Sequence, residues 1–167
     1  MPMHNKEIAE QFEMLADLLE IEDANPFRVR AYRNAAQTIR GYAKSMADML
    51  KQGEDLSSLP DIGKDLAGKI KTIVDTGEFP TLEETKSHTP AALSDLMKIE
   101  GLGPKRIKSL YKNLNIQSLD DLKQAAEAGR IQQLEGFGKK TEQMIKERVA
   151  RFAGVKSRIR LMEAEEI

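Results

Sequence analysis

The stretch LMKIEGLGPKRIKSL, from Leu96 to Leu110, decides the fold, because its pattern occurs three times in the chain. The other copies are LSSLPDIGKDLAGKI (56–70) and IQQLEGFGKKTEQMI (131–145). All three have apolar residues at the first, fourth, seventh and fifteenth places and glycine at the eighth, and the last two copies also have glycine at the sixth. Glycine is favoured where φ is positive or where backbone must approach a partner closely. We therefore interpret each copy as a helix end, a tight hairpin and the start of a second helix.

Backbone N–H groups in the first turn of a helix have no acceptor within the helix, and the helix dipole attracts anions to that end. Basic side chains follow the hairpin glycines directly; they are Lys64, Lys105, Arg106, Lys139 and Lys140. A hairpin that grips phosphate is one interpretation, and a purely structural turn is the other. Three copies with basic flanks favour the first, so we expect the chain to bind DNA or RNA.

The second copy is the best formed, and we expect it to matter most. Its Gly103 precedes the amides of Lys105 and Arg106, and we expect a positive φ at this glycine. The first copy has Asp61 at the sixth place, where the others have glycine. Aspartate tolerates turn conformations, but its charge repels phosphate, so we expect the first hairpin to bind phosphate less well.

The composition limits which other sites the chain can build. It has 167 residues, no cysteine and two histidines, which excludes disulfides, thiolate metal sites and a cysteine nucleophile. No apolar run reaches the length of a membrane span, and no signal peptide is evident. We therefore expect a soluble, cytoplasmic protein that is monomeric and has no membrane partner.

The formal net charge of −1 is low for a protein that binds nucleic acid. The charges are segregated along the chain, however. Residues 1–23 carry one lysine and seven acids, residues 24–47 carry five basic residues and no acid, and residues 138–160 carry eight basic residues and two acids. A basic face can therefore exist on a nearly neutral protein.

Residues 25–41 begin with Asn-Pro and end with Gly, which predicts a helix between them. At 100° per residue, Arg30, Arg33 and Arg40 fall on one stripe of this helix, with no acid nearby in the sequence. A solvated face is one interpretation of the stripe. Contact with phosphate is the other, and the absence of acids makes it at least as attractive.

The repeated pattern is similar to the helix-hairpin-helix motif, and the chain resembles the N-terminal region of bacterial or archaeal family X DNA polymerases, which are related to DNA polymerase beta. The segments that carry this resemblance are NPFRVRAYRNAAQTI (25–39), LPDIGKDLAGKIKTIVDTGEF (59–79), LMKIEGLGPKRIKSLY (96–111) and LEGFGKKTEQMI (134–145). The resemblance implies an all-α fold of two helix-hairpin-helix domains. They are residues 1–86 and 90–155, followed at 156–167 by the start of a palm domain.

The resemblance implies that the chain is the DNA-binding portion of a repair polymerase and grips gapped or nicked DNA, including its 5′-phosphate end. Arg28 and Tyr32 match positions that hold this phosphate, and Phe27 falls where the family stacks a ring on a base. The residues that we expect to contact DNA are Phe27, Arg28, Arg30, Tyr32, Arg33, Arg40, Gly63, Lys64, Gly101, Gly103, Lys105, Arg106, Lys108, Gly136, Gly138, Lys139 and Lys140.

A catalytic function is also implied. In many family members the N-terminal domain is a lyase, in which a lysine amine forms a Schiff base with the C1′ aldehyde of an abasic 5′-deoxyribose phosphate before β-elimination. Lys69 matches the nucleophile position. The alternative is an ordinary surface lysine, and Asp65 favours it, because a nearby carboxylate keeps an amine protonated. A third possibility is an interaction scaffold that binds no DNA.

Two kinds of metal site follow from the resemblance. Family hairpins hold a sodium or potassium ion through backbone carbonyls, and the matching carbonyls belong to Met97, Ile99, Leu102, Leu59 and Ile62. The palm domain holds two magnesium ions on an Asp-x-Asp pattern, which this chain does not contain. We therefore expect no polymerase active site and no magnesium site within these residues.

Overall fold

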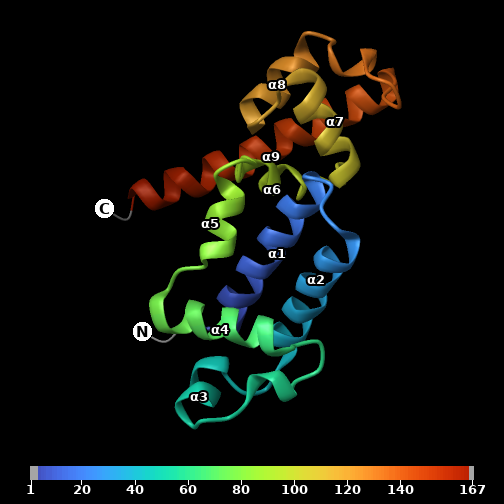
Figure 1. The fold of residues 1–167 in the computed structure, drawn as a ribbon. Helices are drawn as coiled ribbons and strands as arrows, with labels where there is room; N and C mark the ends of the chain where they lie inside the picture. Colours follow the sequence, from blue (N-terminus) through green and yellow to red (C-terminus); the bar gives the residue numbers. More distant parts are fainter. Residues whose placement is uncertain (1–3, 166–167) are drawn as a thin grey trace. The chain divides into compact units, whose positions relative to one another are not determined.

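The computed structural model describes the backbone of residues 4–165 and the side chains of residues 4–152. Within residues 4–165 the chain forms nine α-helices and two 3₁₀ helices, and no strand (Figure 1). The prediction of an all-α fold is therefore confirmed. The chain separates into two compact units, Met1–Thr89 and Pro90–Ile167. None of the described helices is long and apolar enough to span a membrane.

Unit 1 is built around two long helices that pack side by side (Figure 1). Its elements are α1 (Asn5–Ile21), α2 (Pro26–Gly41), α3 (Met46–Lys51), the 3₁₀ helix η1 (Leu56–Ser58), α4 (Lys64–Thr76) and α5 (Pro80–Lys86). Phe12 of α1 is fully buried at their centre. Its ring meets Tyr32 of α2 edge-on with centroids 5.6 Å apart, and Phe79 lies at 5.3 Å. These rings join α1, α2 and the start of α5 into one core.

The predicted helix at residues 25–41 is present as α2. The side chain of Asn25 accepts a hydrogen bond of 2.8 Å from the amide of Phe27, which caps the helix. Pro26 occupies the first helical position, where its missing N–H and fixed φ cost nothing. The local chemistry of two residues thus fixes where the basic helix begins.

Unit 2 contains α6 (Ala92–Leu96), α7 (Pro104–Leu114), α8 (Leu119–Glu127), the 3₁₀ helix η2 (Ile131–Gln133) and α9 (Lys139–Glu165). Its core consists of aliphatic side chains spaced along these helices: Leu93, Leu96, Ile107, Leu110, Leu122, Ile145 and Val149. α9 continues without interruption past residue 155, so the domain boundary expected there falls inside one helix. A glycine within a helix costs only about 1 kcal/mol relative to alanine, which is too little to end a long helix at Gly154.

Candidate nucleic-acid interface

The three sequence copies form hairpins with the same buried framework. The first, seventh and fifteenth places are buried in all three; they are Leu56, Ile62, Ile70, Leu96, Leu102, Leu110, Ile131, Phe137 and Ile145. In each turn the amide of the seventh residue donates to the carbonyl of the fourth. The N···O distances are 3.2 Å in the first hairpin and 3.0 Å in the second and third. The helix before the turn is short, since η1 and η2 have three residues each and α6 has five.

The sixth place of every hairpin lies in the left-handed region. The φ angles are 64° at Asp61, 92° at Gly101 and 84° at Gly136. A positive φ at this place, with the hydrogen bond across the turn, is the pattern of a type II turn. Asp61 adopts it with its carboxylate accepting a hydrogen bond of 3.3 Å from the Thr38 hydroxyl of α2. The sixth place therefore requires a residue that tolerates a positive φ.

The glycine at the eighth place has a different role. Gly63 and Gly103 have φ values of −88° and −87°, which any residue adopts, so the expected positive φ at Gly103 is wrong. Gly63, Gly103 and Gly138 also have no atom within 4 Å of where a Cβ would stand. Neither conformation nor packing inside the chain requires glycine here. What the missing side chain provides is open space at the start of the following helix.

The helices α4 and α7, which follow Gly63 and Gly103, start with uncapped amides. The carbonyls of Gly63, Gly103 and Gly138 accept the first helical hydrogen bonds, at 2.9 Å, 3.0 Å and 3.0 Å. Among the described side chains, none caps the first amides of α4 or α7, whereas Asn25 and Ser118 cap α2 and α8. The first-turn N–H groups of α4 and α7 are thus left to solvent or to an external acceptor.

The basic residues beside the hairpins divide into two groups. Lys64, Lys105, Lys139 and Lys140 are exposed. Lys108 and Arg106 are partly buried. The Arg106 guanidinium donates to the Gly101 carbonyl at 2.8 Å and lies 5.8 Å from the Phe137 ring centroid. The side chain of Arg106 therefore supports the hairpins, and its uncapped backbone amide in the first turn of α7 is the group left for an external acceptor.

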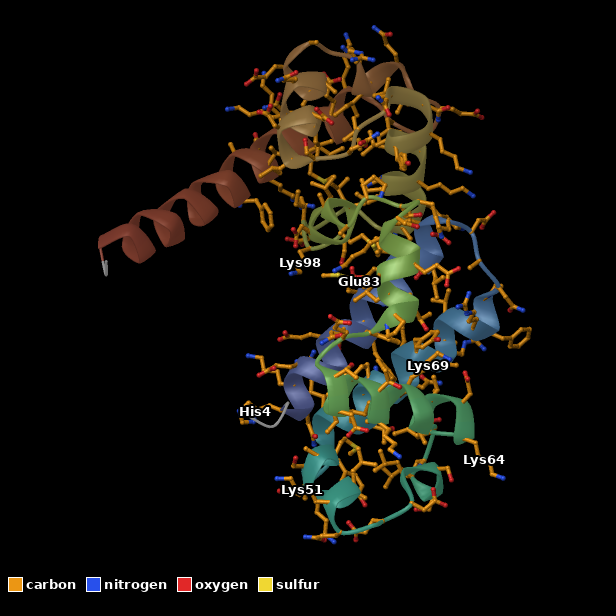
Figure 2. The ribbon with its side chains drawn as sticks, turned by 60° about the vertical axis from the view of Figure 1, so that its left-hand side comes forward. His4, Lys51, Lys64, Lys69, Glu83 and Lys98 are labelled. Atoms are coloured by element: carbon orange, nitrogen blue, oxygen red, sulfur yellow. The ribbon has the colours of Figure 1, made fainter. Side chains whose placement is uncertain are left out.

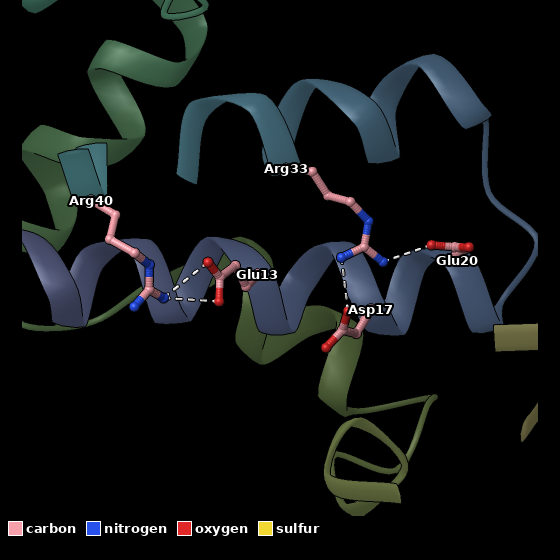
Figure 3. A network of polar contacts seen from close by, with 5 residues as sticks. All are labelled: Glu13, Asp17, Glu20, Arg33 and Arg40. Atoms are coloured by element: carbon pink, nitrogen blue, oxygen red, sulfur yellow. Dashed lines mark hydrogen bonds and ion pairs between the residues drawn. The ribbon is translucent and has the colours of Figure 1, made fainter. Parts of the chain in front are cut away.

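The arginine stripe predicted on α2 is largely a helix–helix contact (Figure 3). Arg33 donates to Asp17 at 3.0 Å and to Glu20 at 2.6 Å, and Arg40 donates to both carboxylate oxygens of Glu13 at 2.9 Å. Partial burial opposes the charge of Arg33, but the hydrogen bonds to Glu20 and Asp17 and their negative charges raise its pKa. The premise that no acid lies nearby is wrong, because α1 places acids beside both arginines.

The start of α2 presents a different surface. Phe27 is 76% exposed, and the guanidinium of Arg30 lies 6.0 Å from its ring centroid. Arg28 is exposed, with its guanidinium 6.0 Å from the ring centroid of Tyr32. Tyr32 itself is only 3% exposed and belongs to the core against Phe12. The structure thus brings Arg28 and Tyr32 together, with only Arg28 on the surface.

Lys69 lies on α4, beyond Lys64 (Figure 2). Its side chain is only 22% exposed, and its amine donates to the Asp65 carboxylate at 2.8 Å. Asp65 is 82% exposed. At the entry to the same hairpin, hydrogen bonds from the hydroxyl and amide of Ser57 lower the pKa of Asp55. Acids therefore accompany the first hairpin on both sides.

The turn carbonyls of the second hairpin have distinct partners. Those of Glu100 and Gly101 accept hydrogen bonds from arginines, and that of Ile99 accepts the Leu102 amide. Among the hydrogen bonds of the described residues outside helices, none ends on the carbonyls of Met97 or Leu102. Within the described residues, no cluster of histidine, aspartate and glutamate is suited to a metal ion.

Arg148 of α9 is the residue that sequence reasoning missed. Its guanidinium donates to the Glu100 carbonyl, 48 residues earlier in the chain. In the sequence it was one of eight basic residues in a charged stretch, and no local signal separates it from the others.

Both units match known helix-hairpin-helix families. Residues 3–79 match the family described as "Helix-hairpin-helix domain", and residues 93–151 match "SAM-like Helix-hairpin-helix tandem". The chain is also 39% identical, over 143 residues, to a Bacillus subtilis (strain 168) protein named DNA polymerase/3'-5' exonuclease PolX. The alignment covers 86% of this chain and 24% of the relative, so the chain spans about a quarter of that protein's length. The chain consists of helix-hairpin-helix domains and is similar in sequence to a family X DNA polymerase, as its motifs predicted.

Proposed function

We propose that this chain binds duplex DNA through its phosphates and favours gapped or nicked DNA with a 5′-phosphate end. The observation that carries the proposal is the open helix start, repeated in three hairpins. At each one, a glycine that neither φ nor packing requires stands before a helix with exposed lysines. Amides and lysines at such an end bind phosphate and carry no information about base sequence.

The start of α2 supports the preference for a DNA end. A phenylalanine that is 76% exposed leaves a flat apolar ring in water, and stacking on an unpaired or terminal base would cover it. Arg30 places its positive charge 6.0 Å from the centre of that ring, and Arg28 is a second exposed arginine, next to Phe27 in the sequence. The Bacillus relative is named as a polymerase and exonuclease. We propose that this chain holds DNA, in the cytoplasm, for chemistry of that kind.

Gapped DNA that carries a 5′-phosphate should bind about tenfold more tightly than the same DNA with a 5′-hydroxyl, because a hydrogen bond between charged groups is worth about 1.5 to 3 kcal/mol. The measurement is fluorescence anisotropy at one fixed salt concentration, with intact duplex as a further ligand. Scrambling the base sequence should change nothing.

The Arg28→Ser variant should lose the difference between the two ends. Lys51→Ser removes one positive charge from an exposed position on α3 and should keep that difference. Equal affinities of the parent for phosphorylated gapped DNA and intact duplex contradict end recognition. A parent that shows no salt-dependent binding to any DNA would leave the interaction scaffold as the remaining function.

A second candidate function is deoxyribose-phosphate lyase activity through Lys69. The observation in its favour is the position of the amine, whose side chain is 22% exposed on the helix that follows the first hairpin. The ion pair with Asp65 opposes it, because a protonated amine cannot attack an aldehyde. Asp65 is mostly exposed, however, and exposed ion pairs contribute little stability.

We also propose a sodium or potassium ion at the second hairpin, held by the carbonyls of Met97, Ile99 and Leu102, with Leu59 and Ile62 offering the corresponding carbonyls in the first. Such an ion would bring positive charge to a bound phosphate. Replacing potassium by tetramethylammonium at constant ionic strength should therefore weaken duplex binding about tenfold, since the ion contributes like one charged contact. Unchanged affinity in tetramethylammonium contradicts the proposed site.

A further inference from the structure

We propose that Arg148 and Arg106 are positioning residues, which hold the second and third hairpins at a fixed separation so that both grip one duplex together. The proposal rests on the proposed DNA binding and concerns unit 2 alone. It assigns to these two arginines a role in the geometry of the interface, in place of direct contact with phosphate.

The turn of the second hairpin is braced by two arginines from different helices. Arg148 of α9 donates to the carbonyl of Glu100, and Arg106 of α7 donates to the next carbonyl, that of Gly101, at 2.8 Å. The place of Arg106 is taken by Leu66 in the first hairpin and Thr141 in the third. The brace is thus specific to the second hairpin.

The absence of a side chain at Gly101 makes room for the Arg148 guanidinium. A Cβ at Gly101 would stand 2.5 Å from the Arg148 Nη1 and 2.7 Å from the Met144 Cε, whereas one at Gly136 would meet nothing within 4 Å. Both glycines have a positive φ, of 92° and 84°. Glycine is therefore required at position 101 for two reasons: its φ is positive, and a side chain there would keep α9 from approaching the turn.

The same contacts reach the third hairpin. The Arg106 guanidinium lies 5.8 Å from the ring centroid of Phe137, a buried residue in the third turn. Glu142, in the first turn of α9, accepts a hydrogen bond of 2.8 Å from the amide of Gln132 at the entry to that hairpin. α9 therefore holds the third hairpin at Glu142 and the second at Arg148, about 9 Å apart along the helix axis at 1.5 Å per residue.

A fixed separation changes how the two hairpins bind. Once one hairpin has bound a phosphate, the other binds as part of the same rigid body, and little freedom remains to be lost. Two linked sites can exceed the affinity of either one by about 10² to 10⁴. Removing the Arg148 contact should therefore lower the affinity for a duplex by the contribution of a whole hairpin. Removing a single surface charge should lower it by the contribution of one phosphate contact.

The test compares Arg148→Met with Arg151→Met, which removes the same charge from an exposed position on the same helix. Affinity for a duplex is measured with each variant alone and combined with Lys105→Ala in the second hairpin. We expect Arg148→Met to weaken binding at least about tenfold and Arg151→Met only to lower the salt slope by about one ion. Lys105→Ala should weaken the parent and the Arg151→Met protein but not the Arg148→Met protein, whose second hairpin has already disengaged.

A second pair of variants keeps the test informative if Arg148→Met does not fold. Gly101→Ala displaces the Arg148 guanidinium, and Gly53→Ala imposes similar strain at a positive φ outside the hairpins, where there is space. Gly101→Ala alone should weaken duplex binding about tenfold or more. If the parent binds DNA and both pairs behave alike, or the loss from Lys105→Ala is undiminished in the Arg148→Met protein, the positioning role is overturned and the proposed function stands. A parent that binds no DNA overturns both.

Discussion

Gly103→Val is expected to remove most of the duplex binding of the second hairpin while unit 2 stays folded. The φ of −87° and ψ of 177° at Gly103 suit valine, and nothing within 4 Å would meet its Cβ. The stability cost is that of a poorer helix cap, about 1 kcal/mol. Two methyl groups, however, would then stand in the open space before the amides of Lys105 and Arg106. Losing one or two hydrogen bonds to a charged phosphate corresponds to a loss of affinity of about tenfold to several hundredfold.

The measurement is a titration with gapped DNA, together with thermal unfolding to show that the variant is folded. Lys105→Ala is the matched control, because it removes a charge and leaves the amides open; it should lower the salt slope by about one ion. Gly63→Val should have a smaller effect than Gly103→Val, since Asp61 and Asp65 already repel phosphate from the first hairpin. A folded Gly103→Val protein that binds gapped DNA like the parent contradicts the assignment of these amides.

The features that sequence reasoning predicted correctly are the ones encoded within a few residues. Apolar residues at the first, seventh and fifteenth places of each copy are buried in the structure as a repeated framework, because these places face the interior of the hairpin and its helices. The cap at Asn25 follows from a single side chain and its backbone preference. The sequence does not show, however, which glycine of a copy has a positive φ. The backbone angles show that the sixth-place glycine has one and that Gly103, at the eighth place, does not.

The features that the sequence did not predict depend on contacts between distant segments. Arg33 and Arg40 have no acid within their own helix, but their partners lie 13 to 27 residues earlier on α1. Tyr32 matched a phosphate position, yet it is buried because its ring fills the core beside Phe12. Arg148 became visible only when α9 was placed against a turn 48 residues away. Charge patterns along one helix therefore overestimate the basic surface, since packing decides which charges are neutralised.

Sodium borohydride should trap a covalent adduct between the protein and a 5′-incised abasic duplex if Lys69 is a nucleophile, and Lys69→Ala should abolish it. Borohydride reduces the Schiff base to a stable amine, so the assay detects attack directly. Lys69→Ala should leave binding to ordinary gapped DNA nearly intact, because a side chain 22% exposed contributes little to grip. Lys64→Ala is the matched control on the same helix, and it should weaken binding without removing the adduct.

Asp65 is the residue most able to suppress this reaction, because its carboxylate accepts a hydrogen bond of 2.8 Å from the amine that would have to attack the aldehyde. Asp65→Lys replaces that attraction by repulsion between two positive charges, so the trapping rate should rise by about tenfold or more. It also adds a positive charge beside the first hairpin, so phosphate binding should tighten in the same variant. If the parent and the Asp65→Lys protein both give no adduct, or Lys69→Ala traps as well as the parent, Lys69 is not the nucleophile. The part of the chain that the structure describes would then only hold DNA, and the partly buried amine would serve to pack α4 and pair with Asp65.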